Sequence, residues 1–156
     1  MSETRKFKLV VWISVFSISS CMFIPALFHT LSFAQSSRAS DEQLIARAIN
    51  GEARGEPYEG QVAVGAIILN RVESPDFPNT VAGVIYQPGA FTAVSDGQIN
   101  VPIDPKSTVV KAARDAMNGW DPTGGSLYYW NPATATSKWI WSRQIIKVIG
   151  KHNFGK

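Results

Sequence analysis

The feature that most constrains this fold is a run of eight apolar or small residues in the middle of the chain, from Val62 to Leu69. A helix over this run would be apolar on nearly every side, which is typical of a helix buried all round. The run is also far too short to cross a membrane, which takes about 20 apolar residues. The sequence therefore predicts a core helix from about Glu59 to Val72.

A second helix is predicted just before the core helix. Ser40 and Gln43 have the spacing of a capping box, in which side chains satisfy the free amides of a helix N-terminus. This helix should run from Asp41 to about Glu52, because Gly55 and Pro57 both favour termination.

Two more helices are expected after the core helix. One covers Thr80–Gln87 and is entered through Asn79. The other begins at Asp104 and Pro105, a cap followed by proline in the first turn, and runs to Asn118. Five prolines lie between residues 74 and 105, so most of that stretch is expected to be loop.

The last part of the chain is rich in aromatic and β-branched residues, which favour strands. Short strands are predicted at Ser126–Trp130, Trp139–Ser142 and Ile145–Ile149, with turns at Asn131-Pro132 and at Gly150. The predicted class is α+β, a small and mainly helical single domain with a short β element.

The N-terminus has the composition of an export segment. Arg5, Lys6 and Lys8 precede an apolar stretch, and Ser32-Phe33-Ala34 fits a signal-peptidase site. Residues 1–34 are therefore predicted to be a signal peptide or a retained membrane anchor, which would be the only membrane contact. Residues 35–40 are expected to form a polar linker, and residues 41–156 the folded domain.

The remaining residues exclude several chemistries. Beyond the N-terminal segment the chain has no cysteine and a single histidine, His152, so a zinc site would have only one of its favoured ligands. A serine nucleophile would need His152 as its base, and neither a Gly-x-Ser-x-Gly pattern nor a phosphate-binding glycine loop is present. No metal or other cofactor is expected, and carboxylates are the main candidates for acid/base chemistry.

Charge also argues against one class of partner. Outside the first eight residues, 12 basic residues face 11 acidic ones. A nearly neutral body gives no electrostatic reason to expect nucleic-acid binding.

Among the carboxylates, Glu52 stands out by its position. It projects from near the middle of the apolar face that Leu44, Ile45, Ala48 and Ile49 form on the predicted helix. A glutamate there is either partly desolvated or at the floor of a cleft, and burial favours the protonated form that a general acid needs. The alternative is a last-turn residue that pairs with Arg54 or with backbone amides.

Glu56 lies four residues further on, but Gly55 and Pro57 are expected to turn it away, to hold Arg54 or the next helix N-terminus. Aromatic residues crowd the second half of the chain, and aromatic platforms suit sugar rings. In the strand predicted there, Tyr129 must face opposite to Tyr128 and Trp130, so part of this cluster should be exposed.

The stretch Leu44–Arg71, LIARAINGEARGEPYEGQVAVGAIILNR, resembles the catalytic core of the spore cortex-lytic enzyme and cell wall hydrolase family. The resemblance extends over nearly all of residues 41–154 in several further blocks. These are Phe77-Pro78, Val84-Ile85-Tyr86-Gln87 with Phe91, Ala116-Met117-Asn118-Gly119, Asp121-Pro122-Thr123-Gly124-Gly125, Tyr128-Tyr129, Asn131-Pro132 and Ile149-Gly150-Lys151-His152-Asn153-Phe154.

This resemblance implies a lysozyme-like domain, similar to lytic transglycosylases, that cuts peptidoglycan between N-acetylmuramic acid and N-acetylglucosamine. It also implies that Glu52 is the catalytic acid/base and that the enzyme acts in the spore cortex or cell wall. The residues expected to shape the substrate groove are Glu56, Tyr86, Gln87, Phe91, Tyr128, Tyr129, Asn131 and His152.

Two alternatives stay open at this point: a hydrolytic muramidase or glucosaminidase of the vegetative wall, and a non-catalytic wall-binding protein. Longer members of the family carry a separate peptidoglycan-binding domain, which is not expected between the export segment and this body. Targeting would then depend on the groove itself or on an accessory protein.

Overall fold

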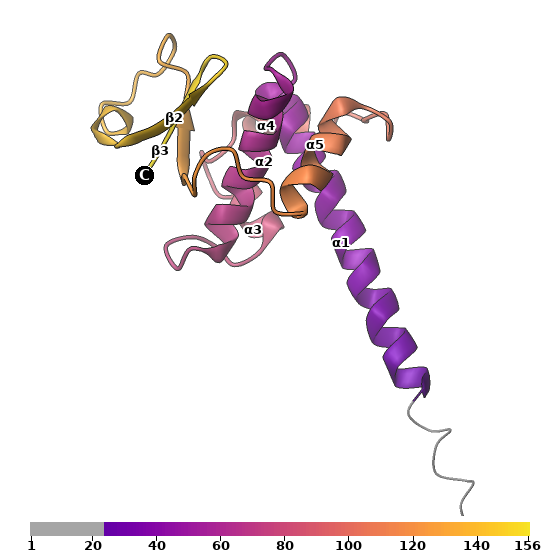
Figure 1. Cartoon of the computed structure of the whole chain (residues 1–156). Coiled ribbons are helices and arrows are strands. Elements are labelled where there is room, and N and C mark those ends of the chain that lie inside the picture. The colour runs from indigo at the N-terminus through magenta and orange to yellow at the C-terminus, as the bar shows by residue number, and fades with distance from the viewer. Residues whose placement is uncertain (1–23) are drawn as a thin grey trace, which may run out of the picture. The chain divides into compact units, whose positions relative to one another are not determined.

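The computed structural model describes residues 24–156, and side chains from residue 35 onward (Figure 1). Residues 1–23, most of the predicted export segment, lie outside the described residues. The chain divides into two units, Met1–Gln35 and Ser36–Lys156, and the second holds the core and the sheet. No helix in the described part of the chain is both long and apolar enough to span a bilayer.

Helix α1 covers Ile24–Ala53, so residues 35–40 are helical where the sequence predicted a linker. Ser40 consequently lies inside the helix, and its prediction as an N-cap was wrong. The physical reason is that no glycine or proline occurs between residues 26 and 50, so nothing in the backbone interrupts the helix. The predicted C-terminal end, at about Glu52, is confirmed to within one residue, since α1 ends at Ala53.

Helix α2 covers Tyr58–Glu73 and is the predicted core helix, with every residue from Gly60 to Ile68 buried. On one side it packs against α1 and against α5, which covers Thr108–Met117. Gly65 permits this close packing, because a Cβ there would lie 3.0 Å from Ala116 Cβ and 3.3 Å from Ile49 Cδ1. The apolar run thus serves as the centre of the helical core.

The shorter helices differ from the prediction at their ends. In α3, Val81–Ile85, the N-cap is Thr80 rather than Asn79, and its hydroxyl accepts a hydrogen bond from the Gly83 amide. Helix α5 begins after Ser107, because Asp104 accepts from the Lys106 amide and so forms a turn instead of a cap. Helix α4, Thr92–Ser95, and the 3-10 helix η1, Gln98–Asn100, were not predicted.

The sheet is three-stranded and antiparallel, with the order β1-β3-β2. Strands β1, Tyr128–Trp130, and β2, Ile145–Ile149, lie where strands were predicted. The central strand β3, His152–Gly155, was missed, and the strand predicted at Trp139–Ser142 is instead the 3-10 helix η2, Ile140–Ser142. Strand β3 is too short and too poor in β-branched residues to be recognised without its neighbours.

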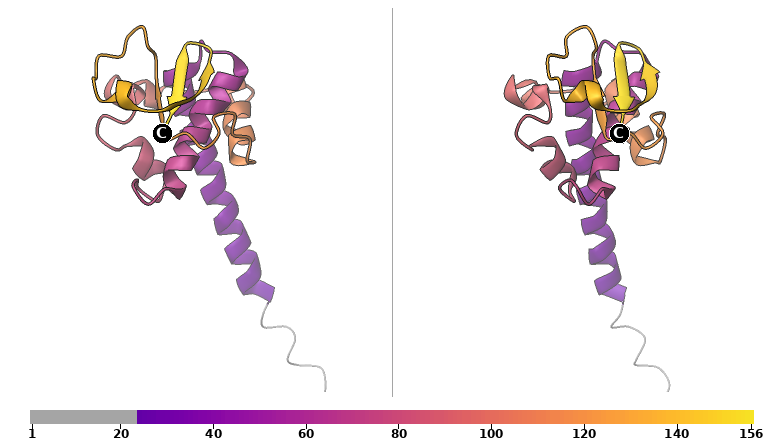
Figure 2. Two further views of the ribbon diagram at one scale, coloured as in Figure 1. Left: turned by 60° about the vertical axis from the view of Figure 1, so that its left-hand side comes forward. Right: turned by 90° about the vertical axis from the view of Figure 1, so that its left-hand side faces the viewer.

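One face of the sheet packs on α2, on the side away from α1 and α5 (Figures 1 and 2). Ala63 and Ile67 of α2 contact Ile149 and Phe154 in a second apolar cluster. Phe154 is fully buried and pairs in register with Tyr129 of β1. The core helix therefore carries the helical bundle on one side and the sheet on the other.

Phe154→Ala should lower the free energy of unfolding by about 3–5 kcal/mol, because it removes the largest side chain between the sheet and α2. Chemical denaturation of the two proteins would measure this loss. Val148→Ala in β2 is the matched control, since its exposed side chain should contribute less than about 0.5 kcal/mol. Equal effects would contradict the packing of the sheet on α2.

Candidate active site

Residues from four elements surround a cavity of about 460 Å³, here called the Glu52 hollow. Glu52 comes from the end of α1, Arg71 from α2, Tyr129 from β1 and His152 from β3. Its lining residues include Glu52, Glu56, Arg71, Tyr129, Asn131 and His152. Five of these six were predicted as site residues, and the tertiary structure brings them together.

The carboxylate of Glu52 is held by two donors from distant parts of the chain. Oε1 accepts a hydrogen bond from the Ala93 amide at 2.7 Å, and Oε2 accepts one from the Tyr129 hydroxyl at 3.0 Å. Arg54 does not pair with Glu52, because its guanidinium donates to Gln98 Oε1 at 2.9 Å. Glu52 is thus fixed in the hollow by a backbone amide and a hydroxyl, and no basic side chain of residues 35–156 forms an ion pair with it.

One of these donors comes from helix α4, which was not predicted from the sequence. Ala93 lies in its first turn, where backbone amides have no partner within the helix. Its amide therefore remains free to donate to Glu52. Gly51 makes this approach feasible, since a Cβ at residue 51 would collide with Ala93 Cβ.

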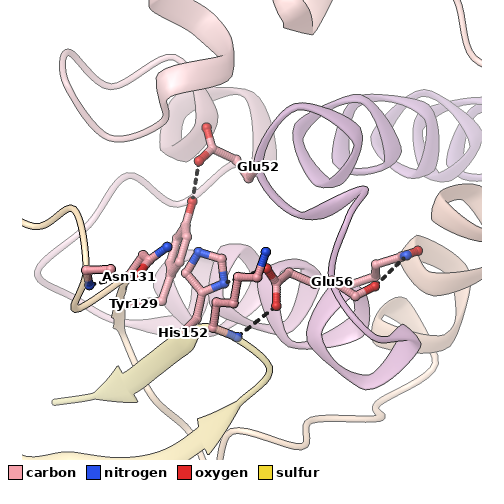
Figure 3. Close-up of polar contacts among 8 residues, drawn as sticks. Glu52, Glu56, Tyr129, Asn131 and His152 are labelled. Atoms are coloured by element: carbon pink, nitrogen blue, oxygen red, sulfur yellow. Dashed lines mark hydrogen bonds and ion pairs between the residues drawn. The ribbon is translucent and has the colours of Figure 1, made fainter.

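Tyr129 points from the sheet toward Glu52 (Figure 3). Its ring lies between Phe91 and Phe154, with centroid distances of 6.3 and 6.2 Å. Burial, together with the charge of Glu52 and the hydrogen bond to it, raises the pKa of Tyr129 well above 10, and Arg71 only partly opposes this. The hydroxyl therefore keeps its proton and acts as a hydrogen-bond donor to the carboxylate.

Glu56 lines the Glu52 hollow, so the prediction that Gly55 and Pro57 turn it away was wrong. Its side chain is 8% exposed, and its Oε2 accepts a hydrogen bond from the Lys151 amide at 2.9 Å. It therefore secures the turn between β2 and β3 instead of holding Arg54. Gly150 in that turn has φ +57°, and a Cβ there would collide with Glu56 Oε2.

His152 lies between Tyr129 and Glu56 (Figure 3). Its Nδ1 is 3.9 Å from Glu56 Oε1, and its ring centroid is 5.6 Å from that of Tyr129. Burial lowers the pKa of His152 below 6.5, although the charges of Glu56 and Glu52 oppose the shift. The imidazole is therefore neutral near pH 7.

Arg71 was not named as a site residue, yet it lines the Glu52 hollow and is only 7% exposed. Its Nε donates to the Leu127 carbonyl at 2.8 Å. Burial lowers the pKa of Arg71, an effect that nearby Tyr129 and Tyr128 oppose. The available sequence indication was a charged residue at the end of an otherwise apolar helical face.

The other predicted groove residues separate into three groups. Gln87 and Tyr128 line a second cavity of about 290 Å³, which shares Arg71, Ala90 and Tyr129 with the Glu52 hollow. Phe91 is buried beneath the site, packed on Tyr129. Tyr86 is half exposed and lines neither cavity, so the structure does not bring it to the site.

Asn131 lines the Glu52 hollow, and its side-chain oxygen accepts from the Ala133 amide at 2.9 Å, which fixes the turn after β1. Within residues 24–156, no group of three His, Cys, Asp or Glu side chains is placed to hold a metal ion. The arrangement offers one oriented carboxylate, a second carboxylate nearby and a buried cation in one open cavity.

Residues 55–155 match the family model described as Cell Wall Hydrolase. The chain belongs to the cell wall hydrolase family. The matched range begins three residues after Glu52 and includes Arg71, Tyr129 and His152.

Several curated members of the cell wall hydrolase family are similar to this chain. The spore cortex-lytic enzyme of Bacillus cereus is 66% identical over 117 residues, which cover 75% of this chain and 44% of that enzyme. The spore cortex-lytic enzyme of Bacillus subtilis is 63% identical over 115 residues, or 74% of this chain and 37% of that enzyme. The chain thus spans less than half the length of these relatives.

Cell wall hydrolase CwlJ of Bacillus subtilis is more distant, at 35% identity over 101 residues, or 60% of this chain and 69% of that protein. Two solved structures from the family superpose on this chain. The catalytic domain of Bacillus cereus SleB matches with a TM-score of 0.70 and 66% identity, over 74% of this chain and 89% of that one.

The second structure is the catalytic domain of the germination-specific lytic transglycosylase SleB of Bacillus anthracis. It matches with a TM-score of 0.71 and 65% identity, over 74% of this chain and 93% of that one. These matches confirm the predicted lysozyme-like, mainly helical α+β fold.

The lowered pKa of His152 predicts a specific pH dependence of stability. The folded state favours the neutral imidazole. The lowered pKa therefore does not change the free energy of unfolding above the unfolded pKa of about 6.5, and it reduces that free energy progressively as the pH falls below this value. Denaturation at several pH values between 7 and 5 should show a smaller loss of stability for His152→Gln than for the wild type. Parallel pH profiles of the two proteins would contradict the lowered pKa of His152.

Proposed function

We propose that this chain cleaves the glycan strand of peptidoglycan between N-acetylmuramic acid and N-acetylglucosamine, as a lytic transglycosylase that opens the spore cortex during germination. The names of its relatives support this proposal, since they include spore cortex-lytic enzymes and a germination-specific lytic transglycosylase. The observation that carries it is the oriented carboxylate of Glu52 in an open cavity.

The contacts of Glu52 suit an acid/base that must carry and release a proton. Oε1 accepts from the Ala93 amide, which can only donate, so this oxygen remains an acceptor in both protonation states. Oε2 faces the Tyr129 hydroxyl, which can donate to the carboxylate and accept from the neutral acid. We therefore place the transferable proton on Oε2.

In the proposed reaction, protonated Glu52 gives its proton to the glycosidic oxygen, and the bond from that oxygen to the muramyl C1 breaks. The muramyl ring becomes oxocarbenium-like. Glu52, now a carboxylate, takes the proton of the muramyl 6-hydroxyl while the oxygen of that hydroxyl bonds to the muramyl C1. The products are an N-acetylglucosamine hydroxyl end and a 1,6-anhydro-muramyl end, and no water is consumed.

Hydrolysis is the alternative reaction, because a second carboxylate, Glu56, lines the same cavity. A second carboxylate could activate a water molecule and give a reducing muramyl end. However, Glu56 is nearly buried, and its Oε2 is occupied by the Lys151 amide. This engagement favours a structural role for Glu56 and a single acid/base at Glu52.

The place of action is part of the same proposal. We propose that residues 1–34 direct export and that residues 35–40 connect this segment to the catalytic domain. We further propose that the enzyme acts on cortex or cell-wall peptidoglycan, to which its groove or an accessory protein guides it. Preference for cortex over vegetative wall is measured directly by comparing the two substrates.

Glu52→Gln should reduce release of anhydro-muramyl products at least about 100-fold, because an amide cannot transfer the proton. The measurement is mass spectrometry of muropeptides released by the full chain from spore cortex and from vegetative wall. Glu59→Gln is the matched control, since Glu59 is exposed and outside the hollow. Reducing ends would identify a hydrolase, and activity lost only on Glu56→Gln would overturn the assignment of Glu52.

Tyr129→Phe should lower the initial cleavage rate by about 5- to 10-fold, because Glu52 loses one of the two bonds that orient it. Rates at saturating substrate measure this effect. Tyr86→Phe is the control, since Tyr86 lines neither cavity. An unchanged rate for Tyr129→Phe would show that the hydroxyl does not support the acid/base.

A further inference from the structure

A second cavity of about 290 Å³ adjoins the Glu52 hollow and shares three lining residues with it, Arg71, Ala90 and Tyr129. We call it the Trp139 hollow. Its lining residues include Arg71, Phe77, Gln87, Tyr128, Tyr129 and Trp139. A polymer held at Glu52 would pass from one cavity to the other without leaving the protein surface.

The walls of the Trp139 hollow are aromatic and held in place. The rings of Tyr128 and Trp139 meet edge to face with centroids 5.0 Å apart, and Phe77 lies 6.0 Å from Tyr128. The Arg143 guanidinium lies over Trp139, 4.6 Å from its ring centroid, and also faces Tyr128. Trp139 nevertheless remains 52% exposed, so part of its ring is open to solvent at the rim of the cavity.

The floor shared by the two hollows contains a buried cation with unused donors. Arg71 is 7% exposed, and among the described residues its guanidinium makes one hydrogen bond, from Nε to the Leu127 carbonyl. No carboxylate of residues 35–156 forms an ion pair with it. Ring faces surround it instead, with Phe77 at 5.2 Å and Phe91 at 5.4 Å.

The free N–H groups of Arg71 are accessible to an acceptor from outside the chain, since no atom of Arg71 is among the fully buried side-chain atoms that lack a partner in the described part of the chain. An arginine has five N–H donors, and a buried donor without an acceptor costs free energy unless water or a ligand supplies one. Four donors of Arg71 therefore remain available toward the two cavities that it lines. The surrounding rings stabilise the positive charge without occupying these donors.

We propose that the Trp139 hollow binds a second, N-acylated sugar ring of the glycan strand, stacked on Trp139, and that Arg71 donates hydrogen bonds to the acyl oxygen of that strand. The inference rests on the proposed function, because it names the neighbouring subsite of the same groove. Gln87, at the edge of the hollow, adds an amide that can bond a sugar hydroxyl.

The stacking is tested with the full chain carrying Glu52→Gln, so that the ligand is not cut. Isothermal titration calorimetry measures binding of a peptide-free tetrasaccharide of alternating N-acetylglucosamine and N-acetylmuramic acid. Trp139→Ala should weaken binding about 5- to 10-fold. Trp141→Ala, an equally exposed tryptophan of the same segment that lies outside the Trp139 hollow, should change it by less than about twofold.

The role of Arg71 is tested by a second pair of ligands, N-acetylchitotetraose and cellotetraose, which differ in having an acetamido group or a hydroxyl. The parent protein should prefer the acetylated ligand by about tenfold or more, and Arg71→Lys should lose most of that preference. Circular dichroism verifies the fold of each variant. If Arg71→Lys does not fold, the ligand preference of the parent and the tryptophan pair still decide the proposal.

Equal affinities of the Trp139→Ala and Trp141→Ala proteins would overturn the stacking, and equal affinities for the acetylated and unacetylated ligands would overturn the acyl contact. Either result could occur while the wild type still releases Glu52-dependent products, in which case the proposed reaction stands and the subsite does not. Trp139-dependent binding without any cleavage of wall glycan would support the subsite and reject the reaction.

Discussion

The fold depends on burying helix α2 on nearly all its sides. From Gly60 to Ile68 no residue of this helix is exposed, so neighbours are needed around its whole circumference. Helices α1 and α5 cover one side, and the sheet covers the other through Ile149 and Phe154. This arrangement places the C-terminal end of α1 and the strand β1 at the same cavity, although Glu52 and Tyr129 are 77 residues apart in sequence.

The two carboxylates of the site are compatible with this apolar setting because each accepts hydrogen bonds from the protein. Glu52 has the Ala93 amide and the Tyr129 hydroxyl, and Glu56 has the Lys151 amide. Arg71 differs, since aromatic faces surround its charge while most of its donors stay unused. Such interactions are stronger where the groups are buried than in water, so they fix the orientation of the groups that face the substrate.

Strand alternation gives the short sheet two roles. Tyr129 and its register partner Phe154 face α2 and Glu52, whereas Tyr128 contacts Trp139 and Trp130 contacts Trp141 on the other face. Tyr128 lines the Trp139 hollow, Trp130 lines the Glu52 hollow and Tyr129 lines both, so one strand of three residues contributes to both cavities. The alternation was predicted from three consecutive aromatic residues, because successive strand side chains point to opposite faces.

The core helix, the end of α1, the two outer strands and the position of Glu52 on an apolar face could all be predicted without the structure. These features follow from local periodicity and from residue inventory, which need no knowledge of distant contacts. The folded structure was needed to find the central strand β3, the donor at Ala93, the inward position of Glu56 and the buried cation at Arg71. Each of these depends on groups far apart in the chain: β3 exists because both of its neighbours pair with it, and Glu56 turns inward because the Lys151 amide meets it there.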